Sequence, residues 1–307
     1  MEYKMHFFIV MLFVTFLDSY AQDFMIIKSP ADSLREVGDL KGALNEYYRC
    51  YSNDPTDKIN IYNYACTLSK TKQYDSCFKY LHLAIKLDTV FNALYDPDFI
   101  SLKKDKRWAD FENTLINMLE IKTKIHIKDI VYAKKLWKMT ALDQAYYSEI
   151  RLAENKIGES SNVVSALWDL KEMINDKNQK ELKILIHQKG WPKISMVGSR
   201  ASATAFLIIQ HSDIKKQKIY LPIIKKLCEM KEASWQDYAL MYDRIQVGQN
   251  KPQKYGSQLR FNKKTNSYEL FPLENEEKVD EWRMSIGLET LSEYLSMWGL
   301  KVEQKKQ

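Results

Sequence analysis

Between about residue 24 and residue 120 the sequence repeats itself at an offset of 34 residues. The texts GDLKGALNEYYRCYSND, from position 38, and KQYDSCFKYLHLAIKLD, from position 72, superimpose without a gap. Small and larger apolar side chains recur at matched places. The matches are Ala31 with Ala65, Leu34 with Leu68, Ala43 with Cys77, Tyr47 with Leu81, Cys50 with Ala84, and Pro55 with Thr89. This period predicts stacked antiparallel helix pairs, in which small residues let two helices approach closely.

The spacing resembles the tetratricopeptide repeat, whose period is also 34 residues. The resemblance covers about a third of the chain and implies two repeats closed by a short capping pair over 92–111. It implies either a concave groove that holds a protein or peptide partner, or a spacer packed against a second domain. Five tyrosines could line such a groove or fill the core of the module: Tyr47, Tyr48, Tyr62, Tyr64 and Tyr80.

Residues 1–22 have the layout of an export signal. An eleven-residue stretch, 7–17, is apolar at all positions but one, and Ser19 and Ala21 follow at the small positions of a cleavage site. The stretch is shorter than the roughly 20 residues that span a bilayer. We therefore expect a signal peptide, cleavage before Gln22, a periplasmic or secreted protein, and no membrane span in the mature chain. A buried N-terminal helix is the alternative.

The composition indicates a globular protein. Hydrophobic residues make up 45% and charged residues 28% of the 307, with nine glycines and seven prolines, which excludes collagen-like and disordered chains. The excess of 46 basic over 40 acidic residues is too small and too evenly spread to indicate nucleic-acid binding. Export would permit disulfides, but the four cysteines have no CxxC spacing. We expect free, buried thiols at Cys50, Cys66, Cys77 and Cys228, with a Cys50–Cys66 bridge as the alternative.

In the second half of the chain, apolar residues recur at helical spacing up to about residue 255, where this pattern ends. The expected helices cover 128–155, 160–174, 178–189, 197–211, 213–230, 234–247, 277–286 and 289–298. Residues 255–259 and 267–271 flank a polar turn and predict a β-hairpin. The sequence thus predicts an all-α fold with one small β-hairpin. Its expected parts are a signal peptide (1–21), a helical-repeat module (22–124), a helical domain (125–300) and a polar tail (301–307).

Uncommon polar residues recur along this helical domain in four groups. They are Gly190-Trp191-Pro192 before Val197-Gly198; Gln210-His211 before Asp213, Gln217 and Tyr220-Leu221-Pro222; Ala239 before Asp243-Arg244; and Gln253 before Tyr255-Gly256-Ser257-Gln258. This order resembles a bacterial family catalogued as a domain of unknown function, over about residues 130–300. Ser257 stands where that family usually has threonine. The resemblance implies export and fusion to tetratricopeptide repeats in some members, and it implies no known reaction.

One hypothesis makes these residues a pocket of an enzyme or ligand-binding protein. His211, at the end of a very apolar helix, would be a general acid or base of hydrolase type, oriented by Asp213 or Asp243. Arg244 and Arg283 would hold an anionic group of a small ligand. The remaining residues would donate hydrogen bonds to the ligand: Gln210, Gln217, Gln253, Tyr255 and Gln258.

The other hypothesis makes the same residues a buried polar network in a non-enzymatic scaffold or peptide-binding protein, with Asp243 and Arg244 as an internal ion pair. We expect no metal site and no cofactor in either case. There is no HExxH, no second histidine near His211, no phosphate-binding glycine loop and no dinucleotide fingerprint.

Overall fold

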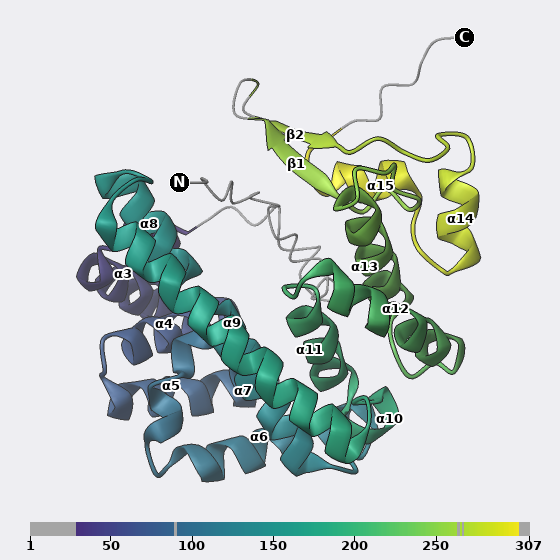
Figure 1. Ribbon diagram of the computed structural model, residues 1–307. Coiled ribbons are helices and arrows are strands. Elements are labelled where there is room, and N and C mark those ends of the chain that lie inside the picture. The colour runs from purple at the N-terminus through teal and green to yellow at the C-terminus, as the bar shows by residue number, and fades with distance from the viewer. Residues whose placement is uncertain (1–28, 89–90, 263–264, 266, 301–307) are drawn as a thin grey trace. The chain divides into compact units, whose positions relative to one another are not determined.

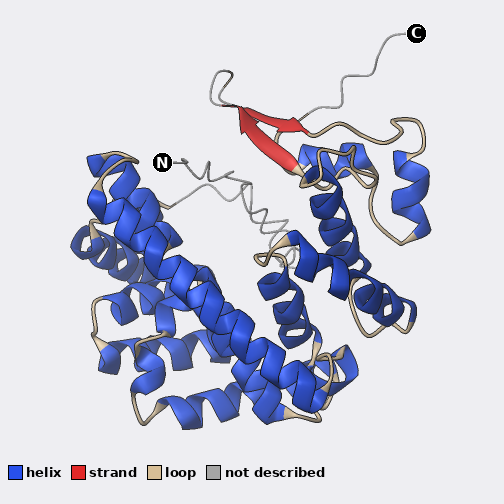
Figure 2. Cartoon of the chain, in the orientation of Figure 1, coloured by secondary structure: helices blue, strands red, loops and turns tan. Residues whose placement is uncertain are grey.

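The computed structural model describes residues 29–88, 91–262, 265 and 267–300 (Figure 1). The expected signal peptide and polar tail lie outside the described residues. The prediction of an all-α fold with one small β-hairpin is confirmed (Figure 2). The described residues up to Ile208 form one compact unit, and those from Ile209 onward form another.

The N-terminal unit begins with two helix pairs. The first is α2 (Pro30–Glu36) with α3 (Leu40–Asn53), and the second is α4 (Lys58–Lys70) with α5 (Tyr74–Leu87). Helix α5 begins and ends 34 residues after α3, so the structure has the period that the sequence predicts. The small residues at the matched places are fully buried between the helices: Ala31, Ala43, Ala65 and Cys77.

Local side chains set where these helices begin. Ser29 and Asp32 form a reciprocal capping box at the start of α2, and Asp57 accepts hydrogen bonds from the first N–H groups of α4. Helix α3 ends before Pro55, as the sequence predicts.

Residues 91–123 differ from the expected capping pair. Three short 3₁₀ turns, η3 (Phe91–Leu94), η4 (Pro97–Phe99) and η5 (Leu102–Lys104), come before a single helix, α6 (Trp108–Thr123). The first member of the pair cannot form a long helix, because Pro97 begins a new turn whose N-terminus Asp96 caps. These turns still supply buried core side chains such as Phe99 and Leu102.

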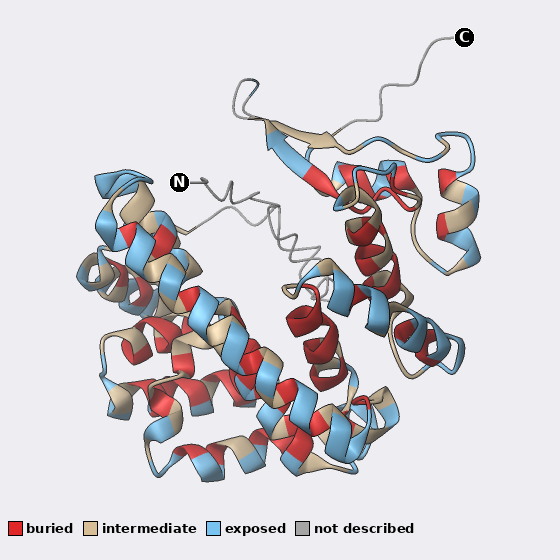
Figure 3. Ribbon diagram, in the orientation of Figure 1, coloured by how far each residue is buried: buried red, intermediate tan, exposed pale blue. Residues whose placement is uncertain are grey.

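The rest of the N-terminal unit consists of five helices. They are α7 (Ile130–Gln144), α8 (Tyr147–Ile157), α9 (Asn162–Lys189), α10 (Ile194–Val197) and α11 (Ser199–Ile209). Helix α7 packs against α9 and against η3 and η4. Figure 3 shows α11 buried over most of its length.

Three of the expected helices in this region are wrong in extent. The expected helix 128–155 breaks into α7 and α8, because Ala145 is extended and Tyr146 takes a φ of 72°. The expected helices 160–174 and 178–189 are one helix, α9, since polar residues without glycine or proline do not interrupt a helix. Helix α9 ends at Gly190, as predicted.

The C-terminal unit contains α12 (Ile214–Glu229), α13 (Trp235–Val247), α14 (Val279–Ser285) and α15 (Leu291–Ser296). Strands β1 (Leu259–Asn262) and β2 (Ser267–Leu270) pair antiparallel, with Leu259 opposite Leu270. The first strand therefore begins later than expected. Residues 255–258 form an irregular loop, because their backbone groups bond to buried side chains rather than to a strand.

Two chemical expectations can be compared with the described residues. All four cysteines are free, so the Cys50–Cys66 bridge is not formed. Three of them are buried and Cys50 is half-buried. None of the described helices combines the length and apolarity needed to cross a membrane.

Candidate functional site

Asp243 lies at the centre of a buried network in the C-terminal unit. Helix α13 carries this fully buried carboxylate, which accepts the backbone N–H groups of Lys254 at 2.8 Å, Tyr255 at 3.0 Å and Ser257 at 2.9 Å. Burial raises the pKa of the Asp243 carboxyl, while these backbone hydrogen bonds act in the opposite direction. The carboxylate therefore holds the irregular loop against α13.

Two buried glutamines continue the network. Gln253 donates to the carbonyl oxygens of Gln258, at 3.0 Å, and Phe271, at 2.9 Å, and its own side-chain oxygen accepts the Gln258 N–H at 2.8 Å. The Gln258 side chain donates to the Leu240 carbonyl on α13 at 3.3 Å. The two amides thus tie the loop to α13 and to Phe271, the residue directly after β2.

Arg283 reaches the same loop from α14. This side chain is only 2% exposed, and it donates to the Tyr255 carbonyl at 2.6 Å, the Glu289 carbonyl at 2.6 Å and the Glu289 carboxylate at 3.1 Å. Its guanidinium carbon lies 4.8 Å from the ring centroid of Tyr294, whose hydroxyl donates to the Ser257 carbonyl at 3.1 Å. Burial lowers the pKa of Arg283. The guanidinium therefore binds protein groups on all sides.

A second group of predicted residues surrounds the Gln210 carbonyl. Arg244 donates to this oxygen at 2.9 Å and Gln217 at 3.1 Å, so both side chains hold the turn between α11 and α12. Asp213 caps α12 and pairs with Lys216 at 3.1 Å, and the backbone hydrogen bond of Lys216 lowers the pKa of its carboxyl. His211 is half-buried in the same turn.

The predicted residues therefore fall into two sets. One joins Asp243, Gln253, Tyr255, Gln258 and Arg283, all buried and hydrogen-bonded to protein. The other joins Gln210, Gln217 and Arg244 beside His211 and Asp213. The expected Asp243–Arg244 ion pair is not formed, because the Asp243 carboxylate faces the 254–257 backbone and Arg244 reaches the Gln210 carbonyl.

A comparison with protein-family models matches residues 131–303, more than half of the chain, to a "Family of unknown function (DUF6624)". This chain belongs to the DUF6624 family. The predicted domain of unknown function is thereby confirmed, and both polar sets lie inside the DUF6624 region. No curated protein and no solved structure matches the chain.

Sequence reasoning missed two buried acids in the DUF6624 region, Asp143 and Asp237. Asp237 lies in the first turn of α13, where an acidic residue is common, and only 5% of its surface is exposed. Burial raises the pKa of its carboxyl to about 8. No sequence signal separates this aspartate from an exposed one at the same helix position.

A second missed cluster lies outside the DUF6624 region, in the helix pairs. The Cys66 sulfur and the carboxylates of Asp96 and Asp98 lie within 4.8 Å of one another. Burial raises the pKa of Asp96 to about 6. Arg35 forms an ion pair with Asp98, and the Lys70 ammonium lies 3.7 Å from the same carboxylate. These two cations already balance the acids, so the cluster does not fit a divalent metal ion.

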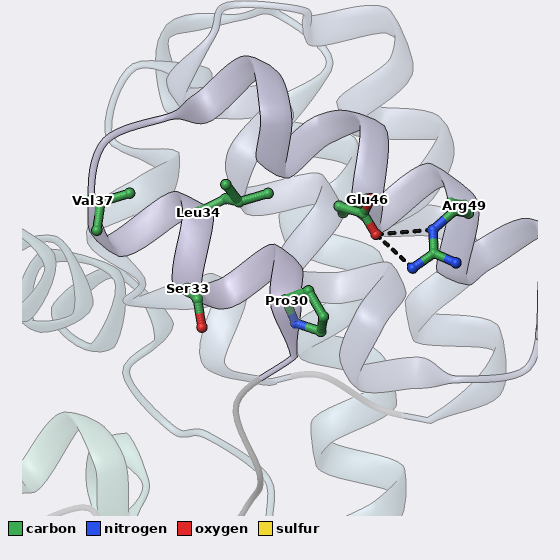
Figure 4. A pocket seen from close by; sticks show the side chains of 6 residues that line it. All are labelled: Pro30, Ser33, Leu34, Val37, Glu46 and Arg49. Atoms are coloured by element: carbon green, nitrogen blue, oxygen red, sulfur yellow. Dashed lines mark hydrogen bonds and ion pairs between the residues drawn. The ribbon is translucent and has the colours of Figure 1, made fainter.

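A pocket lies on the outer side of the first helix pair (Figure 4). Its lining combines apolar side chains with one ion pair, Glu46 to Arg49 at 2.8 Å. The lining residues are Pro30, Ser33, Leu34, Val37, Glu46 and Arg49. None of the predicted site residues is among them.

The tyrosines of the helix pairs form two groups. Tyr47 and Tyr62 are buried, and their hydroxyls donate to Asp32 at 2.6 Å and Asp96 at 2.7 Å. Four others form a closed ring across α3, α4 and α5, which we call the tyrosine cluster: Tyr48, Tyr51, Tyr64 and Tyr80. Sequence reasoning omitted Tyr51 from this set.

Each ring of the tyrosine cluster contacts two others, so the four contacts form a closed circuit. The centroid distances are 4.6 Å for Tyr64–Tyr80, 5.2 Å for Tyr51–Tyr80, and 6.4 Å for Tyr48 with both Tyr51 and Tyr64. Tyr48 is 53% exposed and Tyr80 is buried, and burial raises the pKa of Tyr80 to about 12. In the part of the chain that the structure describes, none of the four hydroxyls forms a hydrogen bond with protein. Tyr48 is exposed and Tyr51 and Tyr64 are half-buried, so these three rings of the tyrosine cluster reach the surface.

Proposed function

We propose that this protein is an exported, non-enzymatic binding protein whose tetratricopeptide-like module recognises a segment of another protein through the tyrosine cluster. The observation that carries the proposal is the closed ring of four tyrosines in tilted and edge-to-face contact, whose hydroxyls donate no hydrogen bond to protein. Such side chains offer a large rigid apolar area and a polar tip, and little conformational entropy is lost when they bind. Protein interfaces are enriched in tyrosine for these reasons.

In this proposal the Asp243 network has a structural role in the DUF6624 domain. Its members are buried, and each side chain bonds to backbone groups of the same domain. A ligand could bind Asp243 or Arg283 only after these hydrogen bonds had been broken. Export is supported by the apolar stretch 7–17 and the small residues before Gln22.

Site-specific photo-crosslinking in the producing cells tests the binding proposal. A photoreactive side chain at Tyr48 should yield a defined protein adduct, and one at Ile121, which is 78% exposed in the same unit, should not. The Tyr51→Ala variant should lose the Tyr48 adduct while keeping the circular dichroism of the parent protein. Equal adducts at both positions, or an adduct unaffected by Tyr51→Ala, would contradict the proposal.

N-terminal sequencing of the protein recovered from the same cells tests export. The proposal requires a chain that begins at Gln22 in a periplasmic or secreted fraction. Recovery of intact Met1 from the cytoplasm would exclude the exported state and leave the binding proposal to be judged by the crosslinks alone.

A small-ligand or catalytic site at His211 is the second candidate. Its support is that His211 shares a turn with Asp213, whose side chain is 54% exposed, unlike the buried Asp243. In a working pocket, His211→Ala should leave the melting temperature unchanged. In a structural network the same change should cost about 1–3 kcal/mol, because the partners of the imidazole lose a hydrogen bond. A large drop in melting temperature therefore rejects this candidate.

A further inference from the structure

Helix α12 has a buried apolar face and, beside it, a line of exposed apolar side chains. Its inner face contributes buried core residues, among them Ile224 and Leu227. Its outer face carries Ile219, Ile223 and Met230, which are 63%, 42% and 52% exposed. Spacings of four and seven residues place these three side chains in one line along the helix, which we call the outer stripe. One exposed apolar residue would need no explanation, but the outer stripe runs from Ile219 to Met230, the residue directly after α12.

Lysines surround the outer stripe. The segment 213–230 contains five lysines and two acidic residues, and every one of the lysines is exposed. The lysines are Lys215, Lys216, Lys218, Lys225 and Lys226. By helical spacing, Lys216 lies on one side of the outer stripe, and Lys215 and Lys226 lie on the other. One acidic residue, Asp213, caps the helix and pairs with Lys216, so the remaining lysines keep their charge available.

We propose that the outer face of α12 docks onto an anionic phospholipid surface. The outer stripe lies on the crest of a helix, so its side chains project as a ridge that can enter the boundary between headgroups and acyl chains. Flanking lysines on both sides would then meet lipid phosphates at the same depth. An acidic protein segment would match the charge, but it would need a groove to cover the apolar side chains.

Vesicle co-sedimentation tests the proposal with the chain that begins at Gln22, so that the apolar stretch 7–17 cannot act as an anchor. The vesicles are phosphatidylcholine alone, or phosphatidylcholine mixed with phosphatidylglycerol. The double variant Lys215→Gln/Lys226→Gln removes two charges beside the outer stripe. Its matched control, Lys177→Gln/Lys180→Gln, removes two exposed lysines from α9.

The chain should bind the mixed vesicles and not phosphatidylcholine alone. The α12 double variant should bind roughly 30-fold more weakly, at about 5-fold for each lysine near the surface. The α9 control should change binding less than twofold, and Ile219→Ser/Ile223→Ser should abolish it. The proposal is overturned if the parent chain does not bind the mixed vesicles, or if both lysine variants bind equally well. It is also overturned if polyglutamate binds in an α12-dependent manner while the mixed vesicles do not.

Discussion

Replacing Asp243 with alanine removes the one side chain that accepts three backbone N–H groups of the 254–257 loop. Two of these donors, on Tyr255 and Ser257, belong to buried hydrogen bonds. The third donor, on Lys254, lies partly at the surface and can bond to solvent. The free-energy cost of the substitution therefore comes mainly from the N–H groups of Tyr255 and Ser257, which lose their acceptor.

Each buried N–H group left without an acceptor costs about 1–3 kcal/mol. Two such groups give a loss of about 2–6 kcal/mol in the free energy of unfolding. Part of this loss is offset, because the variant no longer buries a carboxylate whose pKa is raised by burial. We therefore expect Asp243→Ala to lower the free energy of unfolding by about 3 kcal/mol, and Asp243→Asn, which keeps one acceptor oxygen, by a smaller amount.

Urea unfolding followed by circular dichroism measures these differences. The matched control is Asp213→Ala, the same substitution at an exposed helix cap in the same unit, which should cost about 1 kcal/mol. The reasoning is refuted if Asp243→Ala costs no more than Asp213→Ala. That result would mean that the 254–257 loop does not depend on the carboxylate.

Three further predictions concern the same unit. In the folded state the pKa of Asp237 is about 8, against the ordinary 3.8 that we expect in the unfolded chain, so between these values the folded state holds a proton that the unfolded state has lost. The free energy of unfolding should therefore fall as the pH rises from about 4 to about 8, by at most about 1.4 kcal/mol per pH unit. Asp237→Asn should remove this dependence in urea titrations at several pH values. Gly256→Ala should cost about 2 kcal/mol in the same assay, because Gly256 has a φ of +68° and a Cβ atom would lie 2.6 Å from a Leu291 methyl carbon. Arg283→Lys should lower the free energy of unfolding by about 2–4 kcal/mol although it keeps the charge, because an ammonium cannot donate to the Tyr255 and Glu289 carbonyls as the forked guanidinium does. A loss below about 1 kcal/mol would contradict this.

Elements marked by local chemistry could be predicted from the sequence. The period of the helix pairs, the end of α9 at Gly190 and the start of α12 after Asp213 all follow from short-range signals. The break between α7 and α8 could not be predicted, because a positive φ at Tyr146 is imposed by packing and not by residue type. The continuity of α9 could have been predicted, because its polar middle lacks any residue that stops a helix.

For the candidate site, the residue types indicate which side chains lie together. They do not indicate whether those side chains face a ligand or the protein backbone. Sequence order indicates that Asp243, Gln253, Gln258 and Arg283 belong together, and the structure places them in one network. Carboxylates, amides and guanidinium groups bind a ligand or a backbone loop with the same hydrogen bonds. Tertiary packing decides which of the two they face, and a single sequence does not report it. Asp237 could not be found at all, since its burial depends on residues distant in the chain.

The match to DUF6624 begins at residue 131, in the first turn of α7, inside a unit that starts much earlier in the chain. Helix α7 packs on η3 and η4, Lys134 bonds to Glu112 at 2.9 Å, and Lys70 bonds to Glu149 at 2.7 Å. A genetic exchange that moved residues 131–303 alone into another gene would strip α7 of these neighbours. In this chain, residues 131–303 are therefore not expected to fold independently of the helices that precede them. Selection on the family domain must act on the preceding helix pairs as well, so the two are expected to be inherited as one block.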